Sequence, residues 1–168
     1  MKFFSKSSGK PIKDYKVLTA STDEAILAGR NYDLHLKKIA PKLPPETRKF
    51  IMSLSYQDWN SHDCPHDAWL QNLEFWVEPN ASERQSLRIM MVLLGSFHDR
   101  ILTFEYSNVI ECNLDISKTN KKSPGDWLFD EFDIDDNGFV THEILWQFGN
   151  PWKITAEKMN FSAHNKHT

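Results

Sequence analysis

The pattern of apolar and polar residues changes part-way along the chain. Up to about residue 60, apolar residues recur every three or four positions, which is typical of amphipathic helices. This spacing predicts a helix over Asp23–Ile39, which Pro41 ends. A second helix is expected to begin near Pro45, a favoured first helical residue, and to end near Ser55. The N-terminal part of the chain is therefore expected to be helical.

Beyond residue 66 the apolar residues alternate with polar ones, which is the pattern of strands. The run Leu87–Leu94 is almost unbroken in apolar residues, so we expect a strand that is covered on both faces. Short connections between the strands favour antiparallel pairing, because a parallel crossover needs a dozen residues or more. The other expected strands are Trp69–Val77, Arg100–Leu114, Trp127–Ile134, Phe139–Phe148 and Trp152–Met159.

The predicted fold class is α+β, with two N-terminal helices packed on an antiparallel sheet of about six strands. The length of 168 residues fits a single domain with one core. Within it we expect a flexible leader over residues 1–13, a helical part over 14–60 and the sheet over 66–161. The expected core residues are Ile39, Phe50, Leu73, Phe75, Leu87, Ile89, Met91, Leu93, Leu102, Phe104, Leu128, Ile144, Trp146 and Ile154.

Charge and composition limit the class of partner and the cellular location that can be expected for the protein. A formal net charge of -3 is too balanced for a nucleic-acid-binding protein. The first ten residues lack the apolar region of a secretory signal, and the sequence has no apolar run long enough to span a membrane. We therefore expect a cytoplasmic protein, in which Cys64 and Cys112 stay reduced.

The segment from Asp133 to Glu143 has the spacing of residues that calcium loops use. It resembles the loop of the EF-hand family, which places oxygen ligands at positions 1, 3 and 5, glycine at position 6 and glutamate at position 12. Asp133, Asp135 and Asn137 would supply the first three ligands, and Gly138 would be the glycine. These three residues are the calcium candidates.

The same segment departs from the EF-hand pattern at its end. The position of the bidentate glutamate is taken by Ile144, and Glu143 lies one residue early. The residues that follow alternate like a strand and reach Pro151, where the family has a second helix. We therefore favour a β-hairpin in which Asp136-Asn137-Gly138 supplies the positive φ of the turn. Weak calcium binding by the three candidates is the alternative.

A second candidate metal site consists of His62, Cys64 and His66, whose imidazole and thiol groups are typical zinc ligands. A structural zinc site normally needs a second pair of ligands, and Cys112 does not belong to such a pair. We favour the interpretation that His66 and Asp67 fix the corner between the helices and the sheet by hydrogen bonds. No cofactor or bound metal is therefore expected.

Several short motifs carry a resemblance to other proteins. The order Lys42-Leu43-Pro44-Pro45-Glu46, a short helix, His66-Asp67-Ala68 and alternating strands that end in Trp152-Lys153-Ile154 resembles a loose family of uncharacterised bacterial proteins. The resemblance implies N-terminal helices followed by an antiparallel sheet, and it assigns no catalytic residues. Some similar small acidic α+β proteins are immunity proteins, which bind a bacterial toxin and block it. An immunity-like role is therefore one expectation.

The aromatic content points to binding rather than catalysis. Six Trp and eleven Phe are many for one core of this size. Five of the Trp residues fall near expected element ends or on mixed faces, where aromatic residues act as interface anchors; they are Trp59, Trp69, Trp76, Trp127 and Trp152. Because no catalytic signature is present either, we expect a non-enzymatic protein that binds another protein. The alternative is that all of these aromatic residues pack inside the core.

Two other functions are the alternatives to protein binding. One is a small metal-dependent hydrolase that uses His66, Asp67, His98 or His142, and the other is calcium binding at the Asp133–Glu143 loop. A dispersed group of His98, Asp99, Glu105 and His142 could also gather on one face of the sheet.

Overall fold

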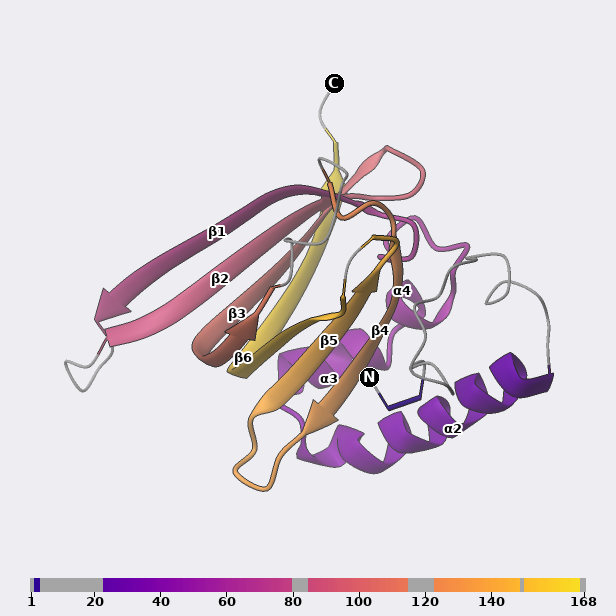
Figure 1. Ribbon diagram of the computed structural model, residues 1–168, viewed down its shortest axis with the longest axis horizontal. Coiled ribbons are helices and arrows are strands. Elements are labelled where there is room, and N and C mark those ends of the chain that lie inside the picture. Colours follow the sequence, from indigo (N-terminus) through magenta and orange to yellow (C-terminus); the bar gives the residue numbers. More distant parts are fainter. Residues whose placement is uncertain (1, 4–22, 80–84, 115–122, 149, 167–168) are drawn as a thin grey trace.

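The computed structural model describes residues 2–3, 23–79, 85–114, 123–148 and 150–166. Its helices precede a six-stranded antiparallel sheet, which confirms the expected α+β fold class (Figure 1). Apart from Lys2 and Phe3, the expected leader lies outside the described residues, as do residues 14–22 of the expected helical part. The elements are α2 (Asp23–Ile39), η1 (Ala40–Lys42), α3 (Pro45–Ile51), α4 (Leu54–Gln57), β1 (Trp69–Pro79), β2 (Gln85–Leu94), β3 (Arg100–Asn113), β4 (Trp127–Ile134), β5 (Val140–Trp146) and β6 (Trp152–Asn165).

The strand order in the sheet is β1-β2-β3-β6-β5-β4. Consecutive strands pair within β1-β2-β3 and within β4-β5-β6, and all pairs are antiparallel. The last strand, β6, lies between β3 and β5 and thereby joins the two halves of the sheet. Figure 1 shows β6 in yellow beside the much earlier β3. The outermost strands are β1 and β4.

The two edge strands approach each other at one end of the sheet. The N–H of Trp127, at the start of β4, donates to the carbonyl of Ala68, and the N–H of Asp67 donates to the carbonyl of Trp127. An isolated antiparallel bridge also joins Trp69 to Asp126. The start of β4 is therefore paired with the segment that leads into β1, whereas the two strands diverge along the rest of their length (Figure 1).

Helices α2 and α3 lie against one face of the sheet (Figure 1). On α2, the buried residues Tyr32, Leu36 and Ile39 recur at the spacing of a single helix face. On α3, the ring of Phe50 stacks on Phe161 of β6 with centroids 4.1 Å apart. None of the described helices is both long and apolar enough to cross a membrane.

Most expected core residues lie between these helices and the sheet. The buried ones are Ile39, Phe50, Ile89, Met91, Leu93, Leu102, Phe104, Leu128, Ile144, Trp146 and Ile154. The expectation was wrong for Phe75, which is 50% exposed. Leu87 is only partly buried, and Leu73 is partly buried and packs against the core. Phe75 pairs with the buried Ile89, so it shares the core face, but it lies on β1, whereas α3 packs on β6 and α2 packs near β4. The core face thus extends beyond the helices at β1.

The apolar strand β2 is covered completely on only one face. Ile89, Met91 and Leu93 point to the core face and are fully buried. Met90 and Val92 point to the opposite face and are partly buried. The expectation of a strand covered on both faces was therefore wrong, because the described helices lie against a single face of the sheet.

The second expected helix is divided into two short ones. The N–H and the hydroxyl of Ser53 both donate to the carbonyl of Phe50, at 2.9 and 2.6 Å. This local pairing ends α3 at Ile51, and α4 begins at Leu54. The expected single helix to Ser55 is corrected accordingly.

Candidate functional site

The zinc candidates are directed to different neighbours. His62 Nδ1 lies 2.7 Å from Oδ2 of Asp99, whose pKa is lowered chiefly by this hydrogen bond. His66 stacks on Trp59 with ring centroids 4.2 Å apart, and its Nδ1 lies 3.2 Å from Oδ2 of Asp67. The N–H of Asp67 also donates to the carbonyl of Trp127 in β4, so this hydrogen bond joins the corner segment to the sheet.

The third zinc candidate, Cys64, is buried, and its Sγ lies 4.0 Å from the carbonyl oxygen of Tyr56. Burial raises the pKa of the Cys64 thiol to about 11. Zinc binds the thiolate, which is a minor form at neutral pH when the pKa is this high. Among the described residues, His62, Cys64 and His66 do not form a group that could hold a metal ion.

The calcium candidates lie at a β-hairpin between β4 and β5, as predicted. Oδ1 of Asp135 accepts the N–H groups of Asn137 at 2.9 Å and of Phe139 at 2.8 Å, and Gly138 has a φ of +85°. The Asp133 carboxylate is directed instead to a histidine of α2. In the part of the chain that the structure describes, no group of three or more His, Cys, Asp or Glu side chains could hold a metal ion.

The structure does not bring together the dispersed polar group of His98, Asp99, Glu105 and His142. His142 is fully buried on the core face, next to Tyr106 of β3. Glu105 precedes Tyr106 in the same strand and therefore points to the opposite face. His98 and Asp99 lie in the turn that connects β2 and β3. These residues do not form a common site.

Inside the core, His142 joins two polar partners. Its Nδ1 lies 2.7 Å from the hydroxyl of Tyr106, and its Nε2 lies 2.9 Å from Oδ2 of Asp130. All three side chains are buried, and burial, with the charge of Asp130, raises the pKa of Tyr106 well above its usual value. Such a chain can carry protons where it reaches a substrate, but here it is enclosed in the core. We interpret it as a structural network.

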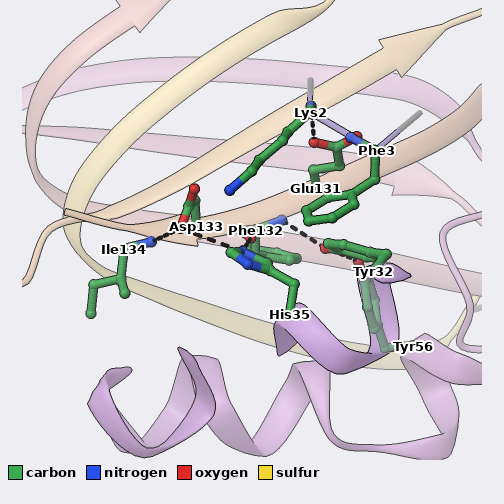
Figure 2. A network of polar contacts seen from close by, with 9 residues as sticks. All are labelled: Lys2, Phe3, Tyr32, His35, Tyr56, Glu131, Phe132, Asp133 and Ile134. Carbon is green, nitrogen blue, oxygen red and sulfur yellow. Dashed lines mark hydrogen bonds and ion pairs between the residues drawn. The ribbon is translucent and has the colours of Figure 1, made fainter. Parts of the chain in front are cut away.

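Side chains of α2 take the place of a neighbouring strand at the middle of β4 (Figure 2). The N–H of Phe132 donates to the Tyr32 hydroxyl at 2.7 Å, and the carbonyl of Phe132 lies 3.2 Å from Nε2 of His35. The Tyr32 hydroxyl also lies 2.9 Å from that of Tyr56. Desolvation by burial raises the pKa of both tyrosines. Neutral phenols therefore hold α2 against the edge of the sheet.

Beside this network lies a pocket of about 370 Å³, which we call the α2–β4 pocket. It contains more acidic than basic side chains, and His35 Nε2 lies 3.4 Å from Oδ1 of Asp133 at its wall. The residues that line it include Lys2, Phe3, His35, Glu131, Asp133 and Glu143. The sequence pattern does not single out this pocket, because its walls come from the N-terminus, α2 and three strands.

The N-terminal residues Lys2 and Phe3 are held in this pocket by Glu131. The N–H of Lys2 donates to Oε2 of Glu131, and the N–H of Phe3 donates to Oε1 at 2.8 Å. Glu131 is only 6% exposed, so its carboxylate needs such donors. These partners are more than 120 residues apart in the sequence, which explains why alternation alone could not reveal them.

A second candidate region is the edge strand β1, which we call the β1 surface and define by Leu73, Phe75 and Val77 on the core face of the sheet and by Trp69 and Trp76 on the opposite face. Trp69, Phe75 and Val77 are 43%, 50% and 55% exposed, and the other two are partly buried. Within the described residues, β1 has a ladder only with β2, and the bridge at Trp69 is the one pairing on its outer side. Among the described residues, β1 therefore combines exposed apolar side chains with an outer edge that lacks a partner strand over most of its length.

The predicted Trp anchors divide into two groups. Trp127 and Trp152 are buried and belong to the core, whereas Trp59 and Trp69 are exposed and Trp76 is partly buried. Two of the three accessible residues therefore lie on the β1 surface.

Comparisons with known proteins add no assignment to either region. A scan of protein-family models and searches of curated proteins and of solved structures find no match to this chain.

Proposed function

We propose that this protein is a non-enzymatic, cytoplasmic protein-binding module and that the β1 surface contacts its partner. The observation that carries the proposal is the combination of an outer strand edge with exposed Phe75 and Val77. An exposed edge offers N–H and C=O groups to an added strand, and apolar side chains beside it give binding energy and specificity. Soluble proteins usually protect such edges, so an unprotected apolar edge favours an interaction site.

The geometry of β1 suggests how a partner would bind. Leu73, Phe75 and Val77 alternate along one face and continue the core face of the sheet, since their partners in β2 include the buried Ile89 and Met91. A strand added beside β1 would place its own apolar residues in the same layer. It would thereby cover side chains that the described helices leave exposed.

A bacterial toxin is the partner that the resemblance to immunity proteins suggests. Blocking a toxin requires a stable complex and no chemistry. This role is consistent with the contacts of His62, His66 and His142, each of which is engaged by a different neighbour.

Affinity purification from the native host, followed by titration of the purified partner, tests the proposal. Phe75→Lys and Val77→Lys place charges on the β1 surface and should each weaken binding by about tenfold or more, as expected for interface anchors. Leu34→Lys is the matched control, because Leu34 is 65% exposed on α2 and the change in charge is the same. It should bind like the unmodified protein, and circular dichroism should show native folding for all variants.

Two results would contradict the proposal. One is a stoichiometric partner whose affinity is the same for all three lysine variants. The other is substrate turnover that is lost with His66→Ala, in a preparation that recovers no protein partner. The second result would favour the hydrolase alternative.

A further inference from the structure

We propose that the α2–β4 pocket is a peptide-binding site for an extended segment with an aromatic side chain, and that Lys2 and Phe3 occupy it as an intramolecular competitor. The site is separate from the β1 surface. The inference therefore holds whether or not β1 binds a partner, and each can fail without the other.

The first support is the way in which Glu131 binds main-chain groups. Its two carboxylate oxygens accept the N–H groups of two consecutive residues, Lys2 and Phe3 (Figure 2). Main-chain N–H groups are present in any peptide except at proline, so this contact recognises an extended backbone rather than a particular side chain. Hydrogen bonds to a charged and largely buried acceptor are also among the stronger ones.

The second support is an aromatic subsite next to this carboxylate. The ring of Phe3 lies 5.5 Å from the ring of Tyr32 and 5.0 Å from that of His35, measured between centroids. These distances are typical of favourable aromatic pairs. The subsite therefore selects an aromatic residue at the position that Phe3 fills.

The receptor side of the site is fixed by contacts that do not involve the N-terminus. Tyr32 and His35 are both hydrogen-bonded to the backbone of Phe132, and Tyr32 also contacts Tyr56 (Figure 2). Departure of Lys2 and Phe3 would leave these contacts in place. A pre-organised aromatic subsite would then be available to another peptide, since little ordering is needed on binding.

The space left beside the N-terminal residues indicates that a ligand can extend further. The pocket of about 370 Å³ lies next to Lys2 and Phe3 and is also lined by Asp133, Asp135 and Glu143. The side chain of Lys2 extends along β4 in the direction of Asp133 (Figure 2). The carboxylates of Asp133, Asp135 and Glu143 favour a basic residue before the aromatic one, because unlike charges attract.

An intramolecular competitor lowers the apparent affinity for an added peptide without changing the site. A tethered segment acts at an effective concentration of about the millimolar range. A free peptide of similar intrinsic affinity must therefore be present at comparable or higher concentration to displace it. Weakening the tethered contact should reveal the site, which gives the proposal a direct test.

The experiment uses the full chain and the tetrapeptide Met-Lys-Phe-Phe, the sequence of residues 1–4. Peptide binding is followed by NMR chemical-shift changes of backbone amides near Tyr32, His35 and Glu131. Lys2→Pro removes one N–H donor to Glu131, because proline has none, and should tighten apparent peptide binding by about tenfold. Lys2→Ala is the matched control, because it keeps the N–H and should increase apparent affinity much less.

A second variant tests whether the peptide binds specifically at this site or non-specifically to the protein surface. Adding Glu131→Gln to Lys2→Pro keeps the size of the side chain but leaves a single acceptor oxygen, so peptide binding should weaken by about tenfold. A peptide with alanine in place of its third residue should also bind at least about tenfold more weakly, since it lacks the aromatic ring. The proposal is overturned if folded Lys2→Pro shows no saturable binding at millimolar peptide. It is equally overturned if Glu131→Gln leaves the binding unchanged.

Discussion

His142 Nε2 lies 2.9 Å from Oδ2 of Asp130 in the interior of the protein, and the imidazole has no exposed surface. Removal of one member of a buried hydrogen-bonded pair leaves the other unsatisfied, so Asp130→Ala should lower the free energy of unfolding by about 1–3 kcal/mol. Denaturant titration measures this change. Glu111→Ala is the control, because it removes an exposed ion pair with Lys153 and should cost less than about 1 kcal/mol. Equal losses for the two variants would contradict a structural role of the network.

Truncation to alanine should separate buried from exposed positions on the core face of the sheet. Phe104 and Met91 are paired across β2 and β3 and are fully buried, so alanine at either should cost about 2–5 kcal/mol. Phe75→Ala should cost much less, because half of this side chain is exposed. The measurement is again the free energy of unfolding in denaturant. A loss below about 0.5 kcal/mol at both buried positions would show that the sheet is arranged differently.

The hairpin turn should form without an ion. The Asp135 carboxylate already accepts the N–H groups of Asn137 and Phe139, so Asp135→Ala should lower stability by about 1 kcal/mol in calcium-free buffer. Calorimetry with calcium and with magnesium should show no tight binding. Submicromolar calcium affinity that disappears with Asp133→Ala would instead support a calcium site of the EF-hand type.

Zinc content and thiol reactivity test the segment around Cys64. Elemental analysis of untagged protein should find no stoichiometric zinc, because His62 is directed to Asp99 and His66 stacks on Trp59, so they do not form a metal-holding group with Cys64. A thiol reagent should modify the partly exposed Cys112 before the buried Cys64. Stoichiometric zinc that is lost with His62→Ala or His66→Ala would refute this prediction.

Alkaline pH should unfold the protein together with ionisation of its buried tyrosines. Burial raises the pKa values of Tyr32, Tyr56 and Tyr106 in the native state, whereas in the unfolded chain they ionise near pH 10. Above that pH the unfolded state binds fewer protons than the native state, so the free energy of unfolding falls as the pH rises. Below about pH 10 the tyrosines are protonated in both states, and their contribution to stability is fully present. Phenolate absorbance and circular dichroism should change in one transition. Normal titration of all tyrosines near pH 10 with an intact fold would contradict these burial assignments.

Elements with strong local signals could be predicted closely from the sequence. The helix Asp23–Ile39 and the strand Trp127–Ile134 have the same bounds in the structure, because periodicity and proline positions act within the element. His142 also had such a signal, since it shares the alternating face of Val140 and Ile144. That position indicates that His142 is buried. Its hydrogen-bond partners, in contrast, can be identified only from the tertiary structure.

Features that depend on distant segments could not be predicted. Alternation does not show that β6 pairs with β3, nor that the described helices pack near β4 and β6 rather than over Phe75. The α2–β4 pocket was missed for the same reason, because Glu131 meets Lys2 and Phe3 across more than 120 residues. Side-chain pairing between remote segments leaves no periodic trace in a single sequence.

The difference between the two sheet edges limits how copies of this chain can assemble. The edge at β4 is engaged by residues 67–69 at its start and by Tyr32 and His35 at Phe132, whereas among the described residues the outer side of β1 is paired only at Trp69. Two copies that joined through β1 would present these engaged β4 edges at both ends of the combined sheet. Strand addition would then terminate after one step, and propagation into a fibre would lack a second docking edge.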